Sequence, residues 1–356
     1  MPSILIAGGA GFIGSNFARM WMRKHDGFKV IVFDKLTYAG NIDNLHDLLG
    51  REGFHFIKGD ICDADAVANV FEEFKPDLVV NFAAETHVDR SLLSPGSFIM
   101  TDIYGVHTLL EACRKHQVKK FVQVSSDEVY GSLNEGAASE THQLRPRNPY
   151  SASKAGGDLM ALAYFHTYNL PVVITRGCNT YGPYQHPEKF IPLLITNAIE
   201  DMPLPIYGDG MQIRDWLFVE DHCEAIELVI EFGEPGGIYN IAANQEIRNI
   251  DVAHLVLEML GKPKTLIKYV ADRPGHDRRY AMDATKLRSL NWTPKYRLED
   301  GLRITVDWYR SNEWWWRKIR EHPSFREYYR RMYEQRLWFD TPEEAIKHIH
   351  MPTSSV

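Results

Sequence analysis

Tyr150 and Lys154 are the residues whose types and spacing most directly suggest chemistry in this sequence. They lie four residues apart at the start of an expected helix, so both side chains fall on one helix face. An ammonium group beside a phenol stabilises the phenolate, which lowers the tyrosine pKa from its usual value of about 10 and lets the side chain act as a base. An isolated pair of this kind is explained equally well as a contact on a helix surface.

Ser125 and Ser126 strengthen the catalytic interpretation of that pair. They end an apolar stretch about 25 residues upstream of Tyr150. Open α/β sheets bind their ligands at the carboxyl edge, where such a stretch ends. A hydroxyl at this edge can hydrogen-bond the phenolate, so we expect a serine and the Tyr–Lys pair to meet in one site.

Three glycines near the N-terminus predict a dinucleotide site. Gly8, Gly11 and Gly14 are spaced as G-x-x-G-x-x-G directly after the first apolar stretch. Glycine there lets the backbone approach a pyrophosphate, whose charge faces the N-terminus of the following helix. Asp34 ends the next apolar stretch, where a carboxylate accepts hydrogen bonds from both adenosine ribose hydroxyls and repels a 2′-phosphate. The pattern favours NAD over NADP, unless these glycines only make tight turns.

Six further residues are expected to line the cofactor site because they lie within the glycine motif or follow the third and fourth expected strands: Phe12, Ile13, Asp60, Ile61, Ala83 and Ala84. Asp60 and Ile61 are candidate contacts to the adenine. A Gly-Asp pair at 59–60 is equally typical of a turn.

Apolar stretches alternate with helical periodicity over the first half of the chain. The expected strands are 3–7, 29–33, 54–58, 78–82, 121–125 and 172–175, and the expected helices are 12–24, 63–74, 95–116 and 151–168. Strands separated by helices of this length form a parallel sheet covered on both faces. The sequence thus predicts an α/β protein with a Rossmann-type doubly wound sheet, in which residues 1–178 form the NAD-binding domain.

A smaller, discontinuous substrate domain is expected over residues 179–340, where Pro, Gly and Asn become frequent. Within it, a strand at 237–242 and a helix at 250–260 are candidates to return to the main sheet. Residues 308–338 are rich in Trp, Tyr, Arg and Glu. We expect an amphipathic helical tail packed on the body, with a partner-binding surface as the alternative.

The composition is that of a folded globular protein. Of 356 residues, 44% are hydrophobic and 24% are charged, which excludes a disordered or collagen-like chain. A formal charge of -7 without long runs of one sign gives no indication of nucleic-acid binding. The four cysteines have neither disulfide nor metal-ligand spacing, so we expect buried free thiols and no metal. No apolar run approaches 18 residues and no signal peptide is evident, so we expect a cytoplasmic protein without a membrane partner.

These motifs resemble those of the extended short-chain dehydrogenase/reductase family of nucleotide-sugar enzymes, and more narrowly those of the dTDP-glucose 4,6-dehydratases. The resemblance covers nearly the whole chain and thins in the last 20 or so residues. Beyond the glycines and Tyr-x-x-x-Lys, it is carried by segments 83–91 (AAETHVDRS), 125–131 (SSDEVYG), 182–189 (GPYQHPEK), 212–216 (QIRDW) and 272–279 (DRPGHDRR).

The resemblance implies a reaction in three parts. The sugar is oxidised at carbon 4, loses water across carbons 5 and 6, and receives the hydride back at carbon 6, so tightly bound NAD is regenerated and should copurify. The elimination needs an acid and a base, which by resemblance are Asp127 and Glu128; an acidic loop in solvent is the alternative. Tyr150 is then the base at the carbon 4 hydroxyl, with Ser126 as its hydroxyl partner. Lys154 lowers the pKa of Tyr150 and holds the nicotinamide ribose.

The resemblance also implies eight substrate-binding residues: His87, Ser126, Asn179, Lys189, Arg214, Asn249, Arg273 and His276. The two arginines and His276 correspond to contacts with the nucleotide diphosphate, whose oxygens suit a guanidinium fork. Surface ion pairs are the alternative for these three. The asparagines are also candidates to cap turns, and His87 lies either near the sugar or packed in the core.

Two departures from the family pattern bear on this site. The family has threonine where this chain has Ser126, which keeps the hydroxyl but loses a methyl group that restricts its rotamer. We expect tyrosine activation to survive this change. Residues 176–181 read RGCNTY where the family has RCSNNY, which places Gly177 and Thr180 near the nicotinamide and the sugar. The sugar that this chain accepts, and its nucleotide, therefore stay open.

The leading prediction is a 4,6-dehydratase that makes dTDP-4-keto-6-deoxy-glucose, a precursor of rhamnose and other deoxysugars. The alternatives within this class are a dehydratase of another nucleotide sugar such as UDP-glucose and, behind it, a 4-epimerase or decarboxylase. Asp127 and Glu128 argue against an epimerase, which has no elimination to catalyse. A non-catalytic NAD-binding regulator on the same fold needs none of the catalytic side chains. The resemblance implies a homodimer formed through helices of the nucleotide-binding domain.

Overall fold

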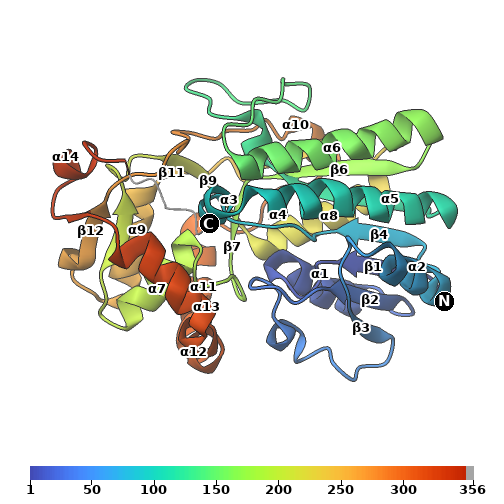
Figure 1. The fold of residues 1–356 in the computed structure, drawn as a ribbon, viewed down its shortest axis with the longest axis horizontal. Helices are drawn as coiled ribbons and strands as arrows, with labels where there is room; N and C mark the ends of the chain where they lie inside the picture. The colour runs from blue at the N-terminus through green and yellow to red at the C-terminus, as the bar shows by residue number, and fades with distance from the viewer. Residues whose placement is uncertain (350–356) are drawn as a thin grey trace.

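Within residues 1–349, which this computed structural model describes, seven strands pair into one parallel sheet in the order β10-β6-β5-β4-β1-β2-β3. The sheet lies in the right-hand part of the molecule in Figure 1. Its strands are β1 (Ser3–Ala7), β2 (Lys29–Asp34), β3 (Phe54–Lys58), β4 (Leu78–Asn81), β5 (Lys120–Ser126), β6 (Val172–Gly177) and β10 (Ile238–Ile241). The prediction of a Rossmann-type doubly wound sheet is confirmed.

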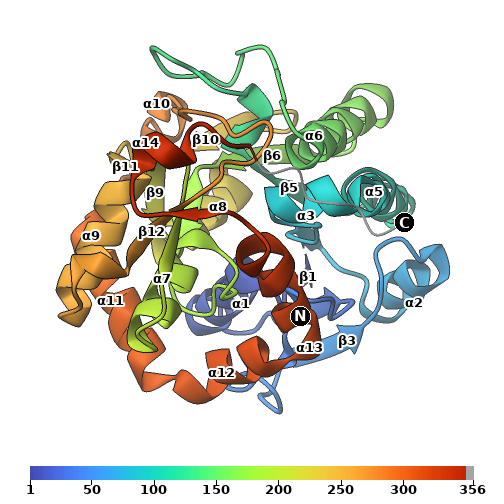
Figure 2. The ribbon, with the colours of Figure 1, turned by 60° about the vertical axis from the view of Figure 1, so that its left-hand side comes forward.

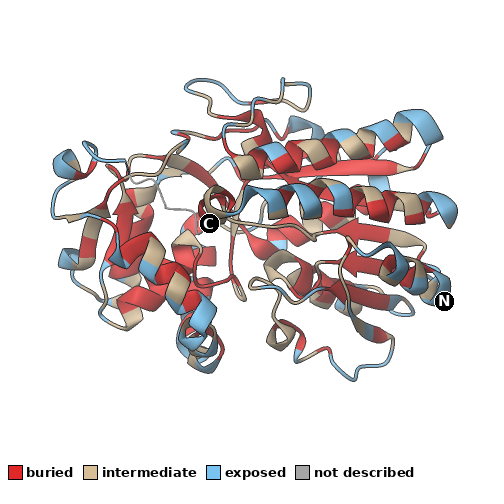
Figure 3. Ribbon diagram, viewed as in Figure 1, coloured by how far each residue is buried: buried red, intermediate tan, exposed pale blue. Residues whose placement is uncertain are grey.

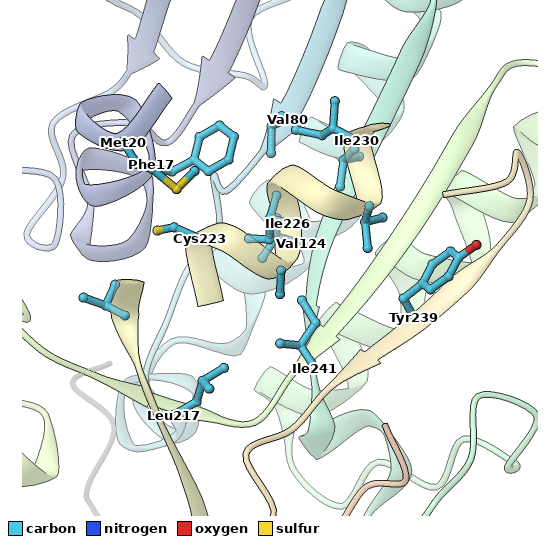
Figure 4. Packing of buried hydrophobic residues seen from close by; sticks show 14 of the residues in the cluster. Phe17, Met20, Val80, Val124, Leu217, Cys223, Ile226, Ile230, Tyr239 and Ile241 are labelled. Carbon is cyan, nitrogen blue, oxygen red and sulfur yellow. The ribbon is translucent and has the colours of Figure 1, made fainter. Parts of the chain in front are cut away.

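Helices cover both faces of this sheet. On one face lie α1 (Phe12–Lys24) and α8 (Val219–Phe232), where Phe17 and Met20 pack with Ile226 and with Val80 and Val124 of the strands (Figure 4). On the other lie α2 (Ala64–Phe74), α5 (Val106–Lys115) and α6 (Pro149–Tyr168), which share a second core cluster. Figure 3 shows the buried strands between helices whose outer faces are exposed. Because both faces are covered, β1 is buried along its whole length.

The helix expected over 95–116 contains a π-helical segment. The chain runs through α3 (Val88–Leu93), α4 (Pro95–Ile99) and the π-helix η2 (Met100–Gly105) into α5. Such segments are frequent near functional sites. This one directs the Asp102 carboxylate to the hydroxyl of Ser153 in α6 at 2.6 Å and to the backbone N–H of Glu85 at 3.0 Å. It therefore ties the loop after β4 to α6.

The smaller domain, on the left of Figure 1, has a hydrophobic core of its own. Helices α7 (Phe190–Ile199), α9 (Asn249–Leu260) and α11 (Leu298–Ser311) pack together beside two three-stranded sheets, ordered β11-β9-β7 and β13-β12-β8. Their strands are β7 (Asn179–Tyr181), β8 (Leu204–Tyr207), β9 (Ile213–Phe218), β11 (Glu246–Arg248), β12 (Ile267–Val270) and β13 (Trp338–Phe339). Short helices complete the chain: η1 (Ile42–Leu45), η3 (Asp127–Tyr130), η4 (Lys264–Leu266), α10 (Thr285–Arg288) and α14 (Pro342–Ala345).

The segment 237–260 divides between the two domains, which corrects the expectation that both its strand and its helix return to the large sheet. Strand β10 pairs with β6 in the large sheet, where the sequence places it. Helix α9, which the sequence also assigned to this return, packs instead on α7 and α11. Its buried residues, including Val252 and Val256, belong to the core of the smaller domain, so its apolar face decides where it packs.

The C-terminal tail packs on the body and reaches across it, as the red segment of Figure 2 shows. It consists of α12 (Glu313–Glu321), α13 (Pro323–Tyr329), the π-helix η5 (Arg330–Glu334), β13 and α14. Trp315 and Trp316 are buried, and the Trp315 indole N–H donates to Asn44 Oδ1 of the large domain at 2.8 Å. The side chain of their neighbour Trp314 is half exposed to solvent. The tail therefore contacts both domains.

The cysteines and the helices bear on two further expectations. All four cysteines are free, and three are buried, but Cys62 is only partly buried, which corrects the expectation for that residue. Over residues 1–349, no helix is both long and apolar enough to cross a bilayer.

Candidate active site

A pocket between the two domains brings together the residues that the sequence predicts to bind or react. It lies at the carboxyl ends of the large sheet, and every predicted cofactor, catalytic and substrate residue is among those that line it. Parallel strands present their carboxyl ends at one edge, which is why residues from Gly8 to His276 in the chain meet here. The predicted residues thus share one site.

The glycine turn forms a cradle that has no room for side chains. Gly8 has a φ of 74°, and a Cβ there would lie 2.4 Å from the backbone N of Ala83. A Cβ on Gly14 would lie 2.5 Å from the carbonyl oxygen of Gly8. Gly11 caps the N-terminus of α1, whose free N–H groups and dipole favour an anion. The cradle fits the pyrophosphate of a dinucleotide.

Asp34 is placed to accept hydroxyl groups beside that cradle. Its two carboxylate oxygens accept backbone hydrogen bonds from Ala10 at 2.9 Å and Leu36 at 2.8 Å, and burial raises its pKa. Each oxygen keeps a second lone pair for a ribose hydroxyl, whereas a phosphate would be repelled. Asp60, the candidate near the adenine, pairs with Lys35 at 2.6 Å. The cofactor end therefore fits NAD.

Helix α6 positions Tyr150 and Lys154 in its first two turns. Asn148 caps the helix by accepting a hydrogen bond from the backbone N–H of Ser151 at 2.9 Å, and a proline follows the cap. Lys154 is buried, and its Nζ donates to the carbonyl of Val124 in β5 at 2.7 Å. The helix start and the strand end are thus joined through the lysine.

The pKa of Tyr150 corrects the expectation drawn from its spacing to Lys154. Burial raises this pKa well above 10, and the charge of Glu128 adds to the effect, while a hydrogen bond with Ser126 opposes it. The predicted lowering by Lys154 does not prevail. The protein's own groups hold Tyr150 as a neutral phenol, so its action as a base requires additional positive charge beside it.

Asp127 and Glu128 are adjacent carboxyls in different surroundings. Burial and the charge of Glu128 raise the pKa of Asp127 to about 8, so Asp127 carries a proton at neutral pH. The Ser126 hydroxyl donates to Asp127 Oδ1 at 3.0 Å, and no group in the described part of the chain pairs with Oδ2. Glu128 Oε2 accepts from the Tyr280 hydroxyl at 3.2 Å and the Asn148 amide at 3.4 Å. The pair can therefore supply one proton donor and one acceptor, and neither carboxyl lies in an open acidic loop.

Three cations line the side of the pocket formed by the smaller domain. Arg214 is buried, and its Nη2 donates to the carbonyl of Asp277 at 2.8 Å. Arg273 donates to Asp89 at 2.8 Å, while its Nε is buried without a partner among residues 1–349. Burial lowers the pKa of Lys189 to about 8. Neither arginine makes the surface ion pair that the sequence left as an alternative.

The two candidate histidines are held neutral. His87 Nδ1 lies 2.9 Å from the Tyr328 hydroxyl, and burial lowers the His87 pKa to about 3. His276 Nδ1 lies 2.7 Å from the Asp272 carboxylate, and burial lowers the His276 pKa to about 4. A neutral imidazole offers a hydrogen bond rather than a charge, so His276 does not resemble the arginines in how it can meet a phosphate.

Asn179 and Asn249 both present an unpaired oxygen at the pocket. Each side-chain Oδ1 is buried, and the structure, as far as it is described, gives neither one a hydrogen-bond partner. The turn-capping role left open by the sequence is therefore not made through these atoms. Since an unpaired buried amide oxygen is unfavourable, the two atoms mark positions for a donor on a ligand.

The sequence did not single out several side chains that line the pocket: Asp89, Glu188, Tyr207, Tyr280 and Tyr333. Asp89 and Glu188 lie inside the segments that carry the family resemblance, and Tyr280 directly follows one, so their positions were a usable signal. Tyr207 and Tyr333 had no local signal. They join the pocket only because distant segments pack together.

Comparisons with known proteins agree with this geometry. A family model described as GDP-mannose 4,6 dehydratase matches residues 5–305. A dTDP-glucose 4,6-dehydratase of Xanthomonas campestris pv. campestris (strain B100) is 48% identical over 335 residues, which cover 88% of this chain and 95% of that protein.

Two crystal structures are similar over nearly all of their length. DesIV, a dTDP-glucose 4,6-dehydratase from Streptomyces venezuelae with NAD and TYD bound, has a TM-score of 0.87 and 45% identity, and the match covers 89% of this chain and 99% of that one. A dTDP-glucose 4,6-dehydratase from Bacillus anthracis str. Ames in complex with NAD has a TM-score of 0.84 and 47% identity, covering 90% and 100% of the two chains.

Proposed function

Because the chain belongs to the GDP-mannose 4,6-dehydratase family, we propose that it converts dTDP-glucose to dTDP-4-keto-6-deoxy-glucose and water with bound NAD. The observation that carries the reaction type is the protonated Asp127 next to Glu128, within the same pocket as Tyr150. An acid, a base and a phenol together are what oxidation followed by elimination requires.

The cofactor is held by the large domain, for which we propose the bounds 1–178 together with α8 and β10. The cradle of Gly8, Gly11 and Gly14 takes the pyrophosphate, Asp34 the adenosine ribose and Lys154 the nicotinamide ribose. Bound NAD supplies a hydride acceptor for carbon 4, a hydride donor for carbon 6, and a positive charge on its nicotinamide ring. Phe12, Ile13, Ile61, Ala83 and Ala84 line the same end of the pocket.

The first proton moves to Tyr150. The positive charge beside Tyr150 offsets the burial that raises its pKa and lets the side chain ionise, so the phenolate oxygen takes the proton of the carbon 4 hydroxyl as that carbon is oxidised. The Ser126 hydroxyl favours the charged form of Tyr150 when it turns from Asp127 and donates its proton to the phenolate instead. The loss of the family's methyl group at Ser126 leaves this contact intact.

The elimination uses the two carboxyls. Glu128 takes the proton from carbon 5, which the neighbouring ketone has made acidic, and Asp127 gives its proton to the carbon 6 hydroxyl, which leaves as water. Glu128 returns its proton to carbon 5 when carbon 6 receives the hydride. The cycle leaves Tyr150 with one proton more and Asp127 with one proton fewer, and their exchange with solvent restores both.

The smaller domain, for which we propose residues 179–340 apart from α8 and β10, binds the nucleotide diphosphate. Arg214, Arg273 and Lys189 supply the positive charge, and the unpaired Nε of Arg273 is suited to a phosphate oxygen. Asn179 and Asn249 accept hydroxyl or amide donors, and His87 and His276 contribute neutral hydrogen-bonding groups.

The test is incubation of the purified protein, without added cofactor, with dTDP-glucose and UDP-glucose separately, followed by mass spectrometry. We expect loss of one water from dTDP-glucose alone. Loss from UDP-glucose alone would transfer the proposal to another nucleotide sugar. A sugar that keeps its mass but changes configuration would identify a 4-epimerase. If neither sugar changes even when NAD is supplied, the non-catalytic NAD-binding regulator would be the remaining hypothesis.

We further propose a homodimer formed through helices of the large domain. The exposed apolar side chains of Ile99 in α4, Met100 and Tyr104 in η2, and Leu159 in α6 lie on neighbouring helices, an arrangement typical of a subunit contact. Light scattering that finds only monomer would overturn this proposal. The cytoplasmic location stays a prediction, supported by the four free cysteines.

A further inference from the structure

His222 connects Gly177 and Thr180, two of the positions at which this chain departs from the family pattern. It lies in the first turn of α8 and is buried, with 2% of its surface exposed. A Cβ on Gly177 would lie 2.5 Å from the imidazole Cε1, so the ring occupies the space that a side chain at 177 would need. The Thr180 hydroxyl oxygen lies 2.7 Å from His222 Nδ1. Gly177 thus makes room for the ring, and Thr180 orients it.

The hydrogen bonds within residues 1–349 leave one ring nitrogen, Nε2, without a partner beside the end of β6. Thr180 donates its hydroxyl proton to the carbonyl of Cys178 at 3.2 Å, so its oxygen accepts from the Nδ1–H of His222. Burial lowers the pKa of His222 to about 4, which keeps the ring neutral and leaves a lone pair on Nε2. Nε2 is buried, has no partner among the described groups, and belongs to a residue that lines the pocket. It is an acceptor that lacks a donor.

The order of strands places this acceptor at the far end of the cofactor. Asp34 ends β2, Gly8 follows β1, Ala83 follows β4 and Ser126 ends β5, and these strands are consecutive neighbours in the sheet. Gly177 ends the next strand, β6, directly beside Ser126. With neighbouring strands about 4.8 Å apart, a dinucleotide that starts at Asp34 and crosses the glycine cradle brings its last ring to the ends of β5 and β6.

We infer that His222 is a positioning residue for the cofactor, whose Nε2 accepts a hydrogen bond from the carboxamide NH₂ of the nicotinamide. The carboxamide is the hydrogen-bonding group of that ring, so this contact fixes the ring's rotation about its bond to the ribose. The inference rests on the proposed function only in requiring that NAD binds in this pocket. It also gives a common reason for Gly177 and Thr180, because both are needed to seat the imidazole.

The test compares NAD with ADP-ribose, which lacks the nicotinamide, on the purified full-length protein. Calorimetric affinities for both, and the NAD retained per subunit, are measured for the native protein, His222→Leu, His222→Gln and Thr180→Val. In His222→Leu we expect NAD to bind about tenfold more weakly, with ADP-ribose unchanged within about twofold. His222→Gln, which keeps a hydrogen-bonding group, should recover most of the loss, and Thr180→Val should show a smaller loss of the same kind. His254→Leu, on α9 in the other domain, is the matched control.

Three results would overturn the inference. Equal weakening of NAD and ADP-ribose in His222→Leu and in Thr180→Val would show that the imidazole only supports the fold. Unchanged affinity for both would show that it does not touch the ring. A rise in the KM for the nucleotide sugar with NAD affinity unchanged would place the contact on the sugar. A native protein that binds NAD but dehydrates no nucleotide sugar would refute the proposed function and leave this measurement valid.

Discussion

The two ends of the pocket are built in different ways. The part of the cofactor end proposed to hold the pyrophosphate and the adenosine ribose is made of backbone glycines and one carboxylate, from neighbouring strands within the first 34 residues. The substrate end is made of side chains from β8, β9, α9, the segment after β12 and the C-terminal tail, which are far apart in the chain. A backbone cradle accepts or refuses a substitution by direct steric contact, whereas a group of side chains weakens stepwise. We therefore expect abrupt losses at one end and graded losses at the other.

The largest effects are expected where the two ends meet. Glu128→Gln keeps the shape of the side chain but removes the base at carbon 5, so dehydration should fall by about a thousandfold. The substrate should still reduce bound NAD, because that step belongs to Tyr150. Mass spectrometry of the product and the absorbance of the reduced cofactor measure the two steps separately.

Tyr150→Phe is the matched variant, since it removes only the hydroxyl. It should stop both the reduction of bound NAD and the dehydration. Unchanged turnover in Glu128→Gln would remove Glu128 from the mechanism, and reduced cofactor accumulating in Tyr150→Phe would contradict the role of the phenol.

A large and abrupt effect is expected at the cofactor end. In Gly14→Ala the new Cβ would lie 2.5 Å from the carbonyl oxygen of Gly8, which must shift into the cradle. We expect NAD affinity to fall by about a hundredfold, measured by calorimetry and by the NAD that copurifies. Gly96→Ala is the control, because a Cβ at Gly96 meets nothing within 4 Å. If Gly14→Ala retained NAD as well as Gly96→Ala, the pyrophosphate would not sit in this turn.

A moderate effect is expected from pH. The Asp127 pKa of about 8 means that its acid form is present below this pH and is lost above it. The rate of dehydration should therefore fall as pH rises past about 8, by about tenfold per unit, while the first reduction of NAD shows no such limb. Asp127→Asn should dehydrate slowly and without this limb. An alkaline limb that persists in Asp127→Asn would assign the titration to another group.

The same contrast separates what the sequence predicts from what it does not. The glycine spacing, Asp34 and the strands of the large sheet are local patterns, and the structure contains them nearly as predicted. The pKa of Tyr150 was predicted in the wrong direction because burial, which depends on the whole fold, outweighs one neighbour at helical spacing. Helix α9 was misplaced because its apolar face fits two cores equally well as a sequence pattern. The aromatic composition of the C-terminal tail predicted that the tail packs on the body. Only the path of the tail in the fold brings Tyr333 to the pocket, and the sequence does not reveal that path.

Tyr333 tests whether the substrate end of the pocket can change without the cofactor end. It lies beyond residue 305, where the family model stops. Its hydroxyl lies 3.4 Å from that of Tyr207, which donates to Asp89 at 2.8 Å, and Arg273 donates to the same carboxylate. Tyr333→Ala removes one wall of the substrate end, so the KM for the nucleotide sugar should rise about tenfold with kcat and bound NAD unchanged.

The control for this variant is Trp314→Ala, at a half-exposed position of the same tail, which should leave all three quantities as they are. Steady-state kinetics and the NAD content of the purified protein decide between two roles for the tail. If Tyr333→Ala lowered kcat or bound NAD along with substrate affinity, the tail would support the whole pocket, and the two ends could not be changed independently. A rise in KM alone would show that a segment outside the family model adjusts substrate binding on a cofactor end that it does not touch.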